Sequence, residues 1–272
     1  MLKVLKFGGS SMADAAHYRQ VRRIVESDPE RRVVVVSAAG KRYSDDTKIT
    51  DLLYLCYAHL QYGVSCDDIY QMIVSRYCAI RDELGLKTDL ETEFAALRER
   101  MSKGMPQDEL VSRGEYFSAI LMAEYLGFEF IDASRWLYFH YDGTIDQGKS
   151  YATLRTLAKD KKVVIPGFYG LMPDGKIRTL TRGGSDITGA LAAAALDASV
   201  YENCVLMADP HIVDNPKTID RATYSELRQL SYSGAQVLHE MTVFPVREKN
   251  IPLNIRNTNE PNHPGTLISD DF

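Results

Sequence analysis

The sequence predicts an α/β protein, a three-layer αβα sandwich with a mainly parallel central sheet and two lobes. Three observations support this prediction. Short apolar runs rich in β-branched residues alternate with longer segments of helical periodicity, a pattern typical of parallel sheets covered by helices. The run Arg32–Ala38 holds four successive valines, as in a strand buried on both faces. Two strand-to-helix turns contain Gly-Gly, and such turns are where ligands bind in open parallel sheets.

The expected strands are Leu2–Phe7, Arg32–Ala38, Gly127–Asp132, Lys162–Pro166, Lys176–Thr181, Val200–Met207 and Ile251–Ile255. The expected helices are residues 13–27, 48–62, 68–84, 89–102, 107–125, 151–159, 185–196 and 234–241. Residues 48–125 are almost entirely helical and are expected to form a helical insertion or lobe. No repeat or evident linker divides the chain, so we expect residues 1–272 to form a single domain.

Composition narrows the class of protein. The 272 residues are 45% apolar and 25% charged, the profile of a globular chain. The formal net charge of −5 argues against nucleic acid or an anionic membrane as a partner. No apolar run approaches the length of a membrane span, and no secretory signal is evident. The four cysteines form no CxxC pair and the six histidines lack metal-site spacing, so we expect a reducing cytoplasm and no metal site built by the protein.

The first Gly-Gly turn directly follows the N-terminal strand, in the run Lys6-Phe7-Gly8-Gly9-Ser10-Ser11. Glycine lets backbone N–H groups approach an anion closely, and a serine can cap the helix that follows. Lys6 could place its ammonium on a transferring phosphate. The alternative is a tight turn beside a surface lysine.

The second Gly-Gly turn opens a strongly helix-forming stretch, in the run Arg182-Gly183-Gly184-Ser185-Asp186. A helix N-terminus favours anions, and Arg182 can grip a carboxylate with two hydrogen bonds. Asp186 could recognise an amine or organise a catalytic lysine. It could equally be a plain N-terminal carboxylate that the helix dipole favours.

The run Ser112-Arg113-Gly114-Glu115 lies inside the amphipathic segment 107–125. A glycine inside a helix costs about 1 kcal/mol, so Gly114 indicates close approach of a backbone or a ligand. Spacing alone favours a solvated helical glutamate at Glu115.

Residues Gly143–Ser150 match the P-loop pattern GxxxxGK[ST], with Lys149 as its lysine. The preceding run Trp136–Tyr141 looks extended but is too polar for the buried central strand of such a core. The loop also lacks further glycines to wrap phosphates, and no strand ending in a metal-binding aspartate follows. A P-loop NTPase therefore remains a minor alternative.

Apart from the P-loop pattern, the motifs above occur in the order found in aspartate kinases of the amino acid kinase family. The chain resembles that family from about residue 3 to residue 268. Further runs that carry the resemblance are Val36-Ser37-Ala38-Ala39-Gly40-Lys41, Pro166-Gly167-Phe168-Tyr169-Gly170, Ala208-Asp209-Pro210 and Val237-Leu238-His239. The resemblance implies the amino acid kinase fold, with substrate on an N-terminal lobe (about residues 1–165) and ATP on a C-terminal lobe (about residues 166–272). It implies transfer of the ATP γ-phosphoryl group to the side-chain carboxylate of L-aspartate, giving 4-phospho-L-aspartate on the route to lysine, threonine and methionine. The Arg-Gly-Gly-Ser-Asp and Ser-Arg-Gly-Glu runs favour aspartate over the glutamate or acetylglutamate of related kinases.

The same resemblance implies residue roles. Lys6 would neutralise the transferring phosphoryl group, and Asp186 would orient Lys6. Residues expected to bind aspartate are Ser37, Thr50, Glu115, Arg182 and Ser185, with Glu115 receiving the amine and Arg182 the α-carboxylate. Residues expected to bind ATP are Lys6, Gly8, Gly9, Ser10, Gly183, Gly184, Met207, Asp209 and His211. The implied partners are L-aspartate and Mg-ATP, with Mg²⁺ carried mainly by the nucleotide, and the chain is expected to form a homodimer or a higher homo-oligomer.

Two departures from the family pattern qualify these roles. Cys204 runs directly into Val205, where aspartate kinases usually carry an extra loop near adenine and ribose, and His211 replaces a typical arginine. Both changes lie on the nucleotide side, so a catalytically weak aspartate-binding homologue is an alternative function. The sequence given stops at Phe272, where a catalytic domain would close, so no C-terminal regulatory domain is expected.

Overall fold

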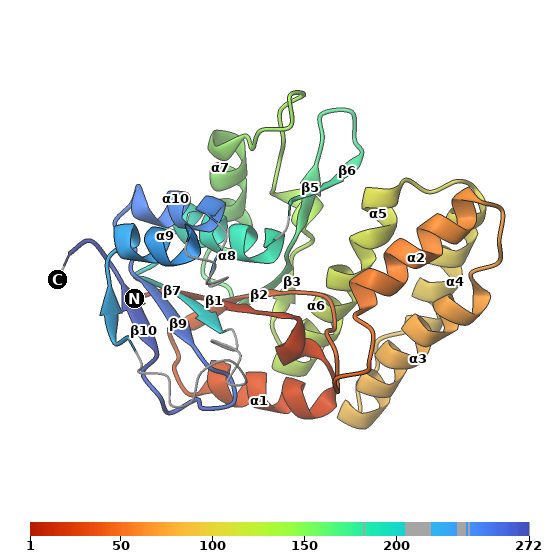
Figure 1. Cartoon of the computed structure of the whole chain (residues 1–272), viewed down its shortest axis with the longest axis horizontal. Coiled ribbons are helices and arrows are strands. Elements are labelled where there is room, and N and C mark those ends of the chain that lie inside the picture. Colours follow the sequence, from red (N-terminus) through yellow and green to blue (C-terminus); the bar gives the residue numbers. More distant parts are fainter. Residues whose placement is uncertain (182, 205–218, 233–237, 239, 272) are drawn as a thin grey trace.

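A mainly parallel sheet forms the middle layer of the computed structural model, which describes residues 1–181, 183–204, 219–232, 238 and 240–271 (Figure 1). Its eight strands follow the order β3-β4-β2-β1-β7-β9-β10-β8, and only the β9–β10 pair is antiparallel. The strands are β1 Lys3–Phe7, β2 Arg31–Val36, β3 Glu129–Phe130, β4 Val163–Pro166, β7 Val200–Cys204, β8 Arg221–Ala222, β9 Leu253–Arg256 and β10 Thr266–Ile268. The predicted fold class is confirmed.

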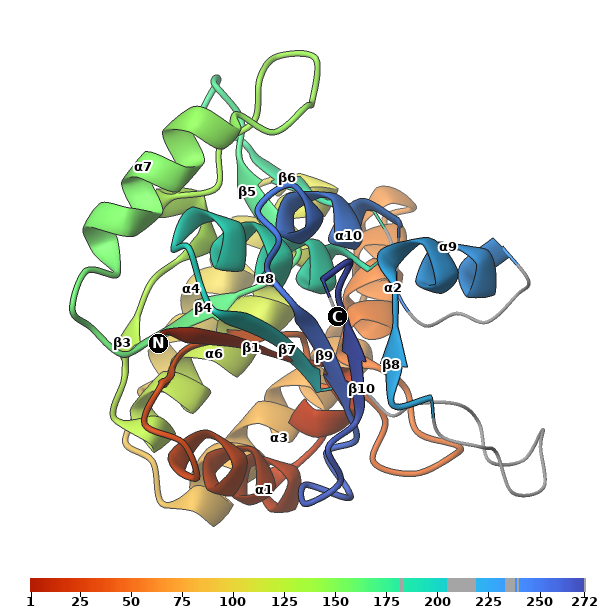
Figure 2. The ribbon, with the colours of Figure 1, turned by 90° about the vertical axis from the view of Figure 1, so that its left-hand side faces the viewer.

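Helices cover both faces of this sheet (Figures 1 and 2). On one face lie α1 Ala15–Glu26, α3 Asp67–Leu84 and α6 Arg113–Leu126. On the other face lie α7 Gln147–Leu157, α8 Gly184–Ala195, α9 Tyr224–Tyr232 and α10 Glu240–Arg247. The predicted helical insertion extends to one side and includes α2 Ile49–Gln61, α4 Leu90–Ser102 and α5 Gln107–Val111.

The four valines of β2 contribute to two separate hydrophobic cores, one on each face of the sheet. Successive side chains of a strand point to opposite faces, so Val33 and Val35 pack with α8 while Val34 and Val36 pack with α1 and α6. All four side chains are essentially inaccessible to solvent. Burying each valine contributes about 1.5–3 kcal/mol, so β2 contributes to the stability of both cores. It pairs in parallel with β1.

The structure corrects several predicted boundaries. The single helix expected at 107–125 is two helices, because Ser112 interrupts it and its hydroxyl donates to the Glu109 carbonyl oxygen at 2.7 Å. The strand expected at Lys176–Thr181 shortens to β6 Ile177–Thr179 and pairs with β5 Tyr169–Leu171 in a separate two-stranded sheet. Val205–Met207 of the expected strand, and residues 234–237 and 239 of the expected helix at 234–241, lie outside the described residues.

The predicted division into two lobes near residue 165 is not marked by a break in the sheet. β4 ends at Pro166 and pairs with β2, and β1 joins β2 to β7. Strands from before and after the boundary therefore share one sheet, and the lobe boundary stays a prediction.

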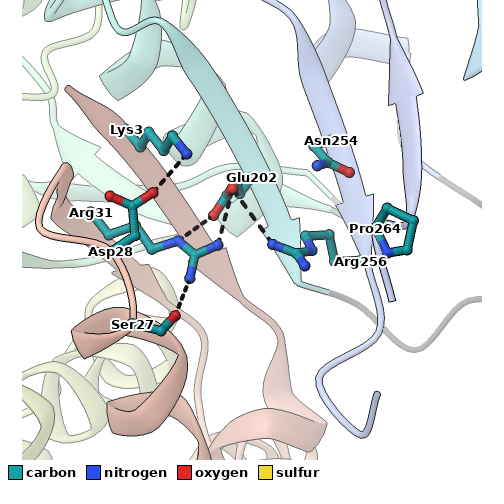
Figure 3. A pocket seen from close by; sticks show the side chains of 8 residues that line it. All are labelled: Lys3, Ser27, Asp28, Arg31, Glu202, Asn254, Arg256 and Pro264. Carbon is teal, nitrogen blue, oxygen red and sulfur yellow. Dashed lines mark hydrogen bonds and ion pairs between the residues drawn. The ribbon is translucent and has the colours of Figure 1, made fainter. Parts of the chain in front are cut away.

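A buried ion pair crosses the sheet beneath β1. The Arg31 guanidinium donates to both carboxylate oxygens of Glu202, at 2.8 and 3.2 Å, and also to the Ile24 carbonyl oxygen at 2.6 Å. Both side chains are buried. They line a cleft of about 420 Å³ in which Lys3 and Asp28 form a second, more exposed pair at 2.7 Å (Figure 3). Most charged groups of this cleft form ion pairs with one another, so we do not take it as the candidate functional site.

Replacing Arg31 by methionine should lower the free energy of unfolding by about 3 kcal/mol, because it leaves the Glu202 carboxylate buried with only the Arg256 guanidinium 3.9 Å away. The matched control is Lys3→Met, which removes the exposed pair of the same cleft and should cost about 1 kcal/mol or less. Urea unfolding of the two variants measures both values. Equal losses would contradict the importance assigned to the buried pair.

Candidate functional site

The predicted site residues meet at the carboxyl edge of the sheet. β1 ends at Phe7 and continues into Gly8, and β2 ends at Val36 and continues into Ser37. The Ser37 N–H donates to the Phe7 carbonyl oxygen at 3.1 Å, which ties these two strand ends together. The first turn of α8 reaches the same edge, as the contact between Lys6 and Asp186 demonstrates. This is the edge at which ligands bind in open parallel sheets.

Lys6 is the buried cation of the site. Its ammonium lies 2.8 Å from a carboxylate oxygen of Asp186, and the residue is only 4% exposed. A Cβ placed on Gly8 would lie 3.4 Å from the Lys6 Nζ, so the ammonium lies directly over the first glycine turn. A desolvated lysine is costly unless it is paired, and Asp186 supplies the pairing charge. The structure therefore brings together a cation, its orienting carboxylate and a glycine turn.

The glycine turn rests on a second backbone segment. Gly8 precedes a short 3₁₀ helix, Gly9–Met12, and the Gly9 carbonyl oxygen accepts a hydrogen bond from the Gly40 N–H at 2.8 Å. A Cβ on Gly40 would lie only 2.5 Å from the Gly9 carbonyl carbon. Since such a contact is sterically forbidden, position 40 requires glycine for the two segments to approach this closely.

Glu115 is the buried carboxyl group of the site, which corrects the solvated glutamate that spacing alone favours. The residue is 4% exposed, and its Oε2 has no hydrogen-bond partner among the described residues. Burial raises the pKa of Glu115 to about 8, although a hydrogen bond from the Ala38 N–H and the charges of Arg113 and Lys6 act in the opposite direction. A buried carboxyl oxygen without a partner is well suited to receive a cation such as an ammonium group.

Gly114 explains why Glu115 comes so close. A Cβ on Gly114 would lie 2.7 Å from the Ala38 Cβ and 3.2 Å from a methyl group of Leu53. The glycine therefore lets α6 pack tightly against the segment after β2 and against α2. The expected close approach at Gly114 is therefore made by the side chains of Ala38 and Leu53.

The remaining predicted residues divide into three groups. Ser37 is half-buried after β2, and Thr50 is half-buried in the first turn of α2, whose Ile49 N–H donates to the Ala39 carbonyl oxygen at 3.0 Å. Gly183 precedes α8 with φ of 78°, Gly184 begins it, and Ser185 is buried where a Cβ on Gly167 would come within 2.6 Å of its hydroxyl. Arg182, Met207, Asp209 and His211 lie outside the described residues.

The P-loop pattern at Gly143–Ser150 does not form an anion site. Asp146 caps α7, and its carboxylate accepts a hydrogen bond from the Lys149 N–H at 3.0 Å. A phosphate at this helix N-terminus would meet a carboxylate that already occupies it. The Lys149 ammonium lies over the Tyr138 ring, 3.9 Å from its centre.

Sequence reasoning missed a set of buried polar residues behind the site. Arg76 and Asp46 form a buried ion pair, and the Tyr77 hydroxyl donates to the Gly114 carbonyl oxygen at 2.6 Å. Arg76 lies on the buried side of α3 with Ile73, Tyr77 and Ile80. A charged residue on an otherwise apolar helix face is the signal that could have identified it.

The fold and the site define an α/β protein that holds a glycine turn and a buried lysine at the carboxyl edge of a mainly parallel sheet. Residues 1–257 match the model of the amino acid kinase family. The chain belongs to this family.

The chain is also similar to individual aspartokinases. It is 36% identical to aspartokinase 3 of Bacillus subtilis, over 98% of this chain and 63% of that protein. It superposes on the crystal structure of Clostridium acetobutylicum aspartate kinase with a TM-score of 0.92 and 44% identity, over 99% of this chain and 63% of that one. The structure of Escherichia coli aspartokinase III in complex with aspartate and ADP gives a TM-score of 0.86 and 28% identity, over 100% of this chain and 65% of that one. The chain thus spans less than two-thirds of the length of these relatives.

None of the helices within the described residues is both long and apolar enough to cross a membrane. In the same part of the chain, no three His, Cys, Asp or Glu residues gather closely enough to hold a metal ion.

The Glu115→Gln variant should be more resistant to unfolding than the wild type, by a margin that grows with pH. The pKa of Glu115 is about 8 in the folded chain against an ordinary value of 4.5, so the folded wild type must hold a proton that the unfolded chain releases. The stability of the wild type relative to the variant is therefore greatest below pH 4.5. It falls by up to about 1.4 kcal/mol per pH unit until it levels off above pH 8.

Thermal melts at pH 5, 7 and 9 measure this margin. Glu83→Gln, at an exposed position of α3, is the control and should show no such trend. A margin between Glu115→Gln and the wild type that stays constant with pH would contradict a protonated, desolvated Glu115.

Proposed function

We propose that this chain is the catalytic part of an aspartate kinase, which transfers the γ-phosphoryl group of ATP to the side-chain carboxylate of L-aspartate. The observation that carries the proposal is the buried Lys6–Asp186 pair over the Gly8 turn, at the same sheet edge as the Oε2 atom of Glu115, which has no partner among the described residues. The similarity to Escherichia coli aspartokinase III, solved with aspartate and ADP, supports both substrates. The product would be 4-phospho-L-aspartate, at the start of the route to lysine, threonine and methionine.

The charges of the site match those of aspartate. The substrate carries one ammonium and two carboxylates, so its site needs an anion and cations. Glu115 would receive the ammonium, and because its pKa is raised to about 8, aspartate binding near neutral pH would release a proton from it. Arg182 would bind the α-carboxylate, while the hydroxyls of Ser37, Thr50 and Ser185 would complete the hydrogen bonds to the substrate.

The transfer itself needs little covalent help from the protein. A side-chain carboxylate oxygen of aspartate would attack the γ-phosphorus in line, forming the new P–O bond as the bond from the γ-phosphorus to the bridging oxygen breaks and ADP leaves. The nucleophile is already ionised at neutral pH, so no general base is required. Lys6 would neutralise charge on the transferring group, the backbone of Gly8, Gly9 and Ser10 would donate to it, and Mg²⁺ would arrive with the nucleotide as part of the substrate.

Asp186 would act by orienting Lys6. Its carboxylate lies 2.8 Å from the Lys6 ammonium, and it belongs to the first turn of α8, so the direction of the lysine side chain is tied to that helix. The same helix begins at Gly184, which with Gly183 would face the nucleotide phosphates at the positive end of the helix dipole. Met207, Asp209 and His211 would bind the rest of the nucleotide.

The setting and assembly of the chain are part of the proposal. Cys56, Cys66 and Cys78 are free thiols, which suits a reducing cytoplasm. A homodimer or higher homo-oligomer is proposed, as the resemblance to aspartate kinases implies. The substrate lobe would comprise about residues 1–165 and the nucleotide lobe about residues 166–272.

The other functions that the sequence left open are less well supported. A P-loop NTPase centred on Lys149 conflicts with the Asp146 carboxylate at the N-terminus of α7. The catalytically weak aspartate-binding homologue rests on the short connection at Cys204–Val205 and on His211, both of which involve residues outside those described. The similarity to aspartokinases favours the kinase.

Lys6→Met should reduce kcat at least about 100-fold, because it removes the cation that stabilises charge on the transferring phosphoryl group. Trapping the acyl phosphate with hydroxylamine in the presence of aspartate and Mg-ATP measures the activity. The matched control is Lys149→Met, which should keep kcat within about twofold of the wild type. The opposite pattern, with Lys149 essential and Lys6 dispensable, would refute the assignment.

A further inference from the structure

We propose that Arg76 is a positioning residue of this kinase, which holds the glycine turn under Lys6 through the carbonyl group of Gly40. The proposal rests on the proposed function, since it assigns Arg76 a part in phosphoryl transfer to aspartate. Arg76 does not touch the predicted substrate groups. It acts from α3, through the segment Ala38–Gly40.

Arg76 makes a buried, two-sided contact. Its Nη1 donates to the Gly40 carbonyl oxygen at 2.9 Å, and its Nη2 donates to both carboxylate oxygens of Asp46 at 2.7 and 2.8 Å. Arg76 and Asp46 are 5% and 6% exposed. A buried guanidinium is tolerated only when a charge and several acceptors satisfy it, so these contacts define one orientation for the side chain.

Asp46 is itself fixed from the solvent side. The Arg42 N–H and Nε donate to one of its carboxylate oxygens at 3.0 and 2.8 Å, and the Arg42 Nη2 donates to the other at 3.1 Å. Hydrogen bonds from Arg42, with the nearby charge of Arg76, hold the pKa of Asp46 well below its usual range. The carboxylate therefore stays ionised between two guanidinium groups, and the loop 42–46 is closed onto α3.

The contact passes from Gly40 to the glycine turn. The Gly40 N–H donates to the Gly9 carbonyl oxygen, and the two backbones are in van der Waals contact. Because the C=O and N–H of a trans peptide point in opposite directions, this bond directs the Ser10 N–H away from Gly40. Ser10 N–H is one of the groups proposed to donate to phosphate. The orientation of that peptide thus depends on where Arg76 holds Gly40.

The neighbouring Tyr77 extends the same support to Glu115. The Ala39 N–H donates to the Tyr77 hydroxyl at 3.5 Å, and that hydroxyl donates to the carbonyl oxygen of Gly114, the residue before Glu115. The Ala38 N–H in turn bonds to the Glu115 carboxylate. Two adjacent residues of α3 therefore hold Gly40 and Ala39, and Ala38 bonds to Glu115, so the segment 38–40 lies between the phosphate turn and the proposed ammonium receptor.

Loss of the Arg76 guanidinium should therefore misplace groups on both sides of the reaction. We expect Arg76→Met to lower kcat by about 10- to 100-fold, because displacement by about 1 Å costs this much in a positioned transfer. The KM for aspartate should rise, since the segment 38–40 also supports Glu115. The dissociation constant of Mg-ADP should change less than about twofold, because Arg76 has no hydrogen bond, within the described part of the chain, to Gly183 or Gly184, which are proposed to face the nucleotide phosphates.

Two further variants separate positioning from stability. Arg76→Lys keeps one charged donor and should recover part of the lost kcat. The matched control is Arg81→Met on the same helix, which removes more exposed contacts to Asp82 and Glu91 and should leave kcat and KM unchanged. All rates are corrected for the folded fraction, measured by thermal melting. A kcat that falls only in proportion to the folded fraction, with KM unchanged, would overturn the proposal.

Hydrogen exchange gives a readout that does not depend on activity. In the full-length chain, Arg76→Met should accelerate exchange at least about tenfold in peptides that contain the Gly40 amide, while Arg81→Met should not. Unchanged exchange at these positions would overturn the proposal that Arg76 holds Gly40 in place, whether or not the chain is a kinase. A wild-type chain that forms no acyl phosphate from aspartate would refute the proposed function and, with it, the positioning role of Arg76 in phosphoryl transfer.

Discussion

The ion pair between Lys6 and Asp186 is the contact on which the arrangement of the site depends. A lysine that is 4% exposed must have a partner, and its partner here comes from the opposite half of the chain. The pair can form only if β1 lies centrally in the sheet and α8 crosses the same face. Both conditions follow from the parallel pairing of β1 with β2 and β7, and from the packing of α8 against those strands.

A continuous series of polar contacts connects this pair to the residues behind the site. The ammonium lies over the Gly8 turn, the carbonyl oxygen of Gly9 accepts from Gly40, and the carbonyl oxygen of Gly40 accepts from Arg76. Arg76 is in turn neutralised by Asp46. Each polar group in this series has a defined partner, which makes the series rigid and costly to distort. Glu115 departs from this pattern, and its unpartnered Oε2 supports the proposal that it receives the ammonium group of the substrate.

Much of the fold, and part of the site, follows from local sequence patterns. The valine run predicted β2, and the Gly-Gly turns predicted the two places where β1 and α8 meet the site. The patterns failed where burial depends on the whole structure. α6 is buried on most of its surface, so the solvated face that spacing suggested for Glu115 does not exist. β8 and β10 are too short for a periodic signal, and nothing local to α3 indicates which loop Arg76 will contact.

A crystal structure of the chain with L-aspartate and a non-hydrolysable Mg-ATP analogue tests the central claim most directly. The aspartate ammonium should contact Glu115, and the side-chain carboxylate of aspartate and the γ-phosphoryl group should meet beside the Lys6 ammonium over Gly8 and Gly9. Asp186 should remain within hydrogen-bonding distance of Lys6. Nucleotide bound at Lys149, or aspartate bound in the cleft around Arg31 and Glu202, would contradict this arrangement.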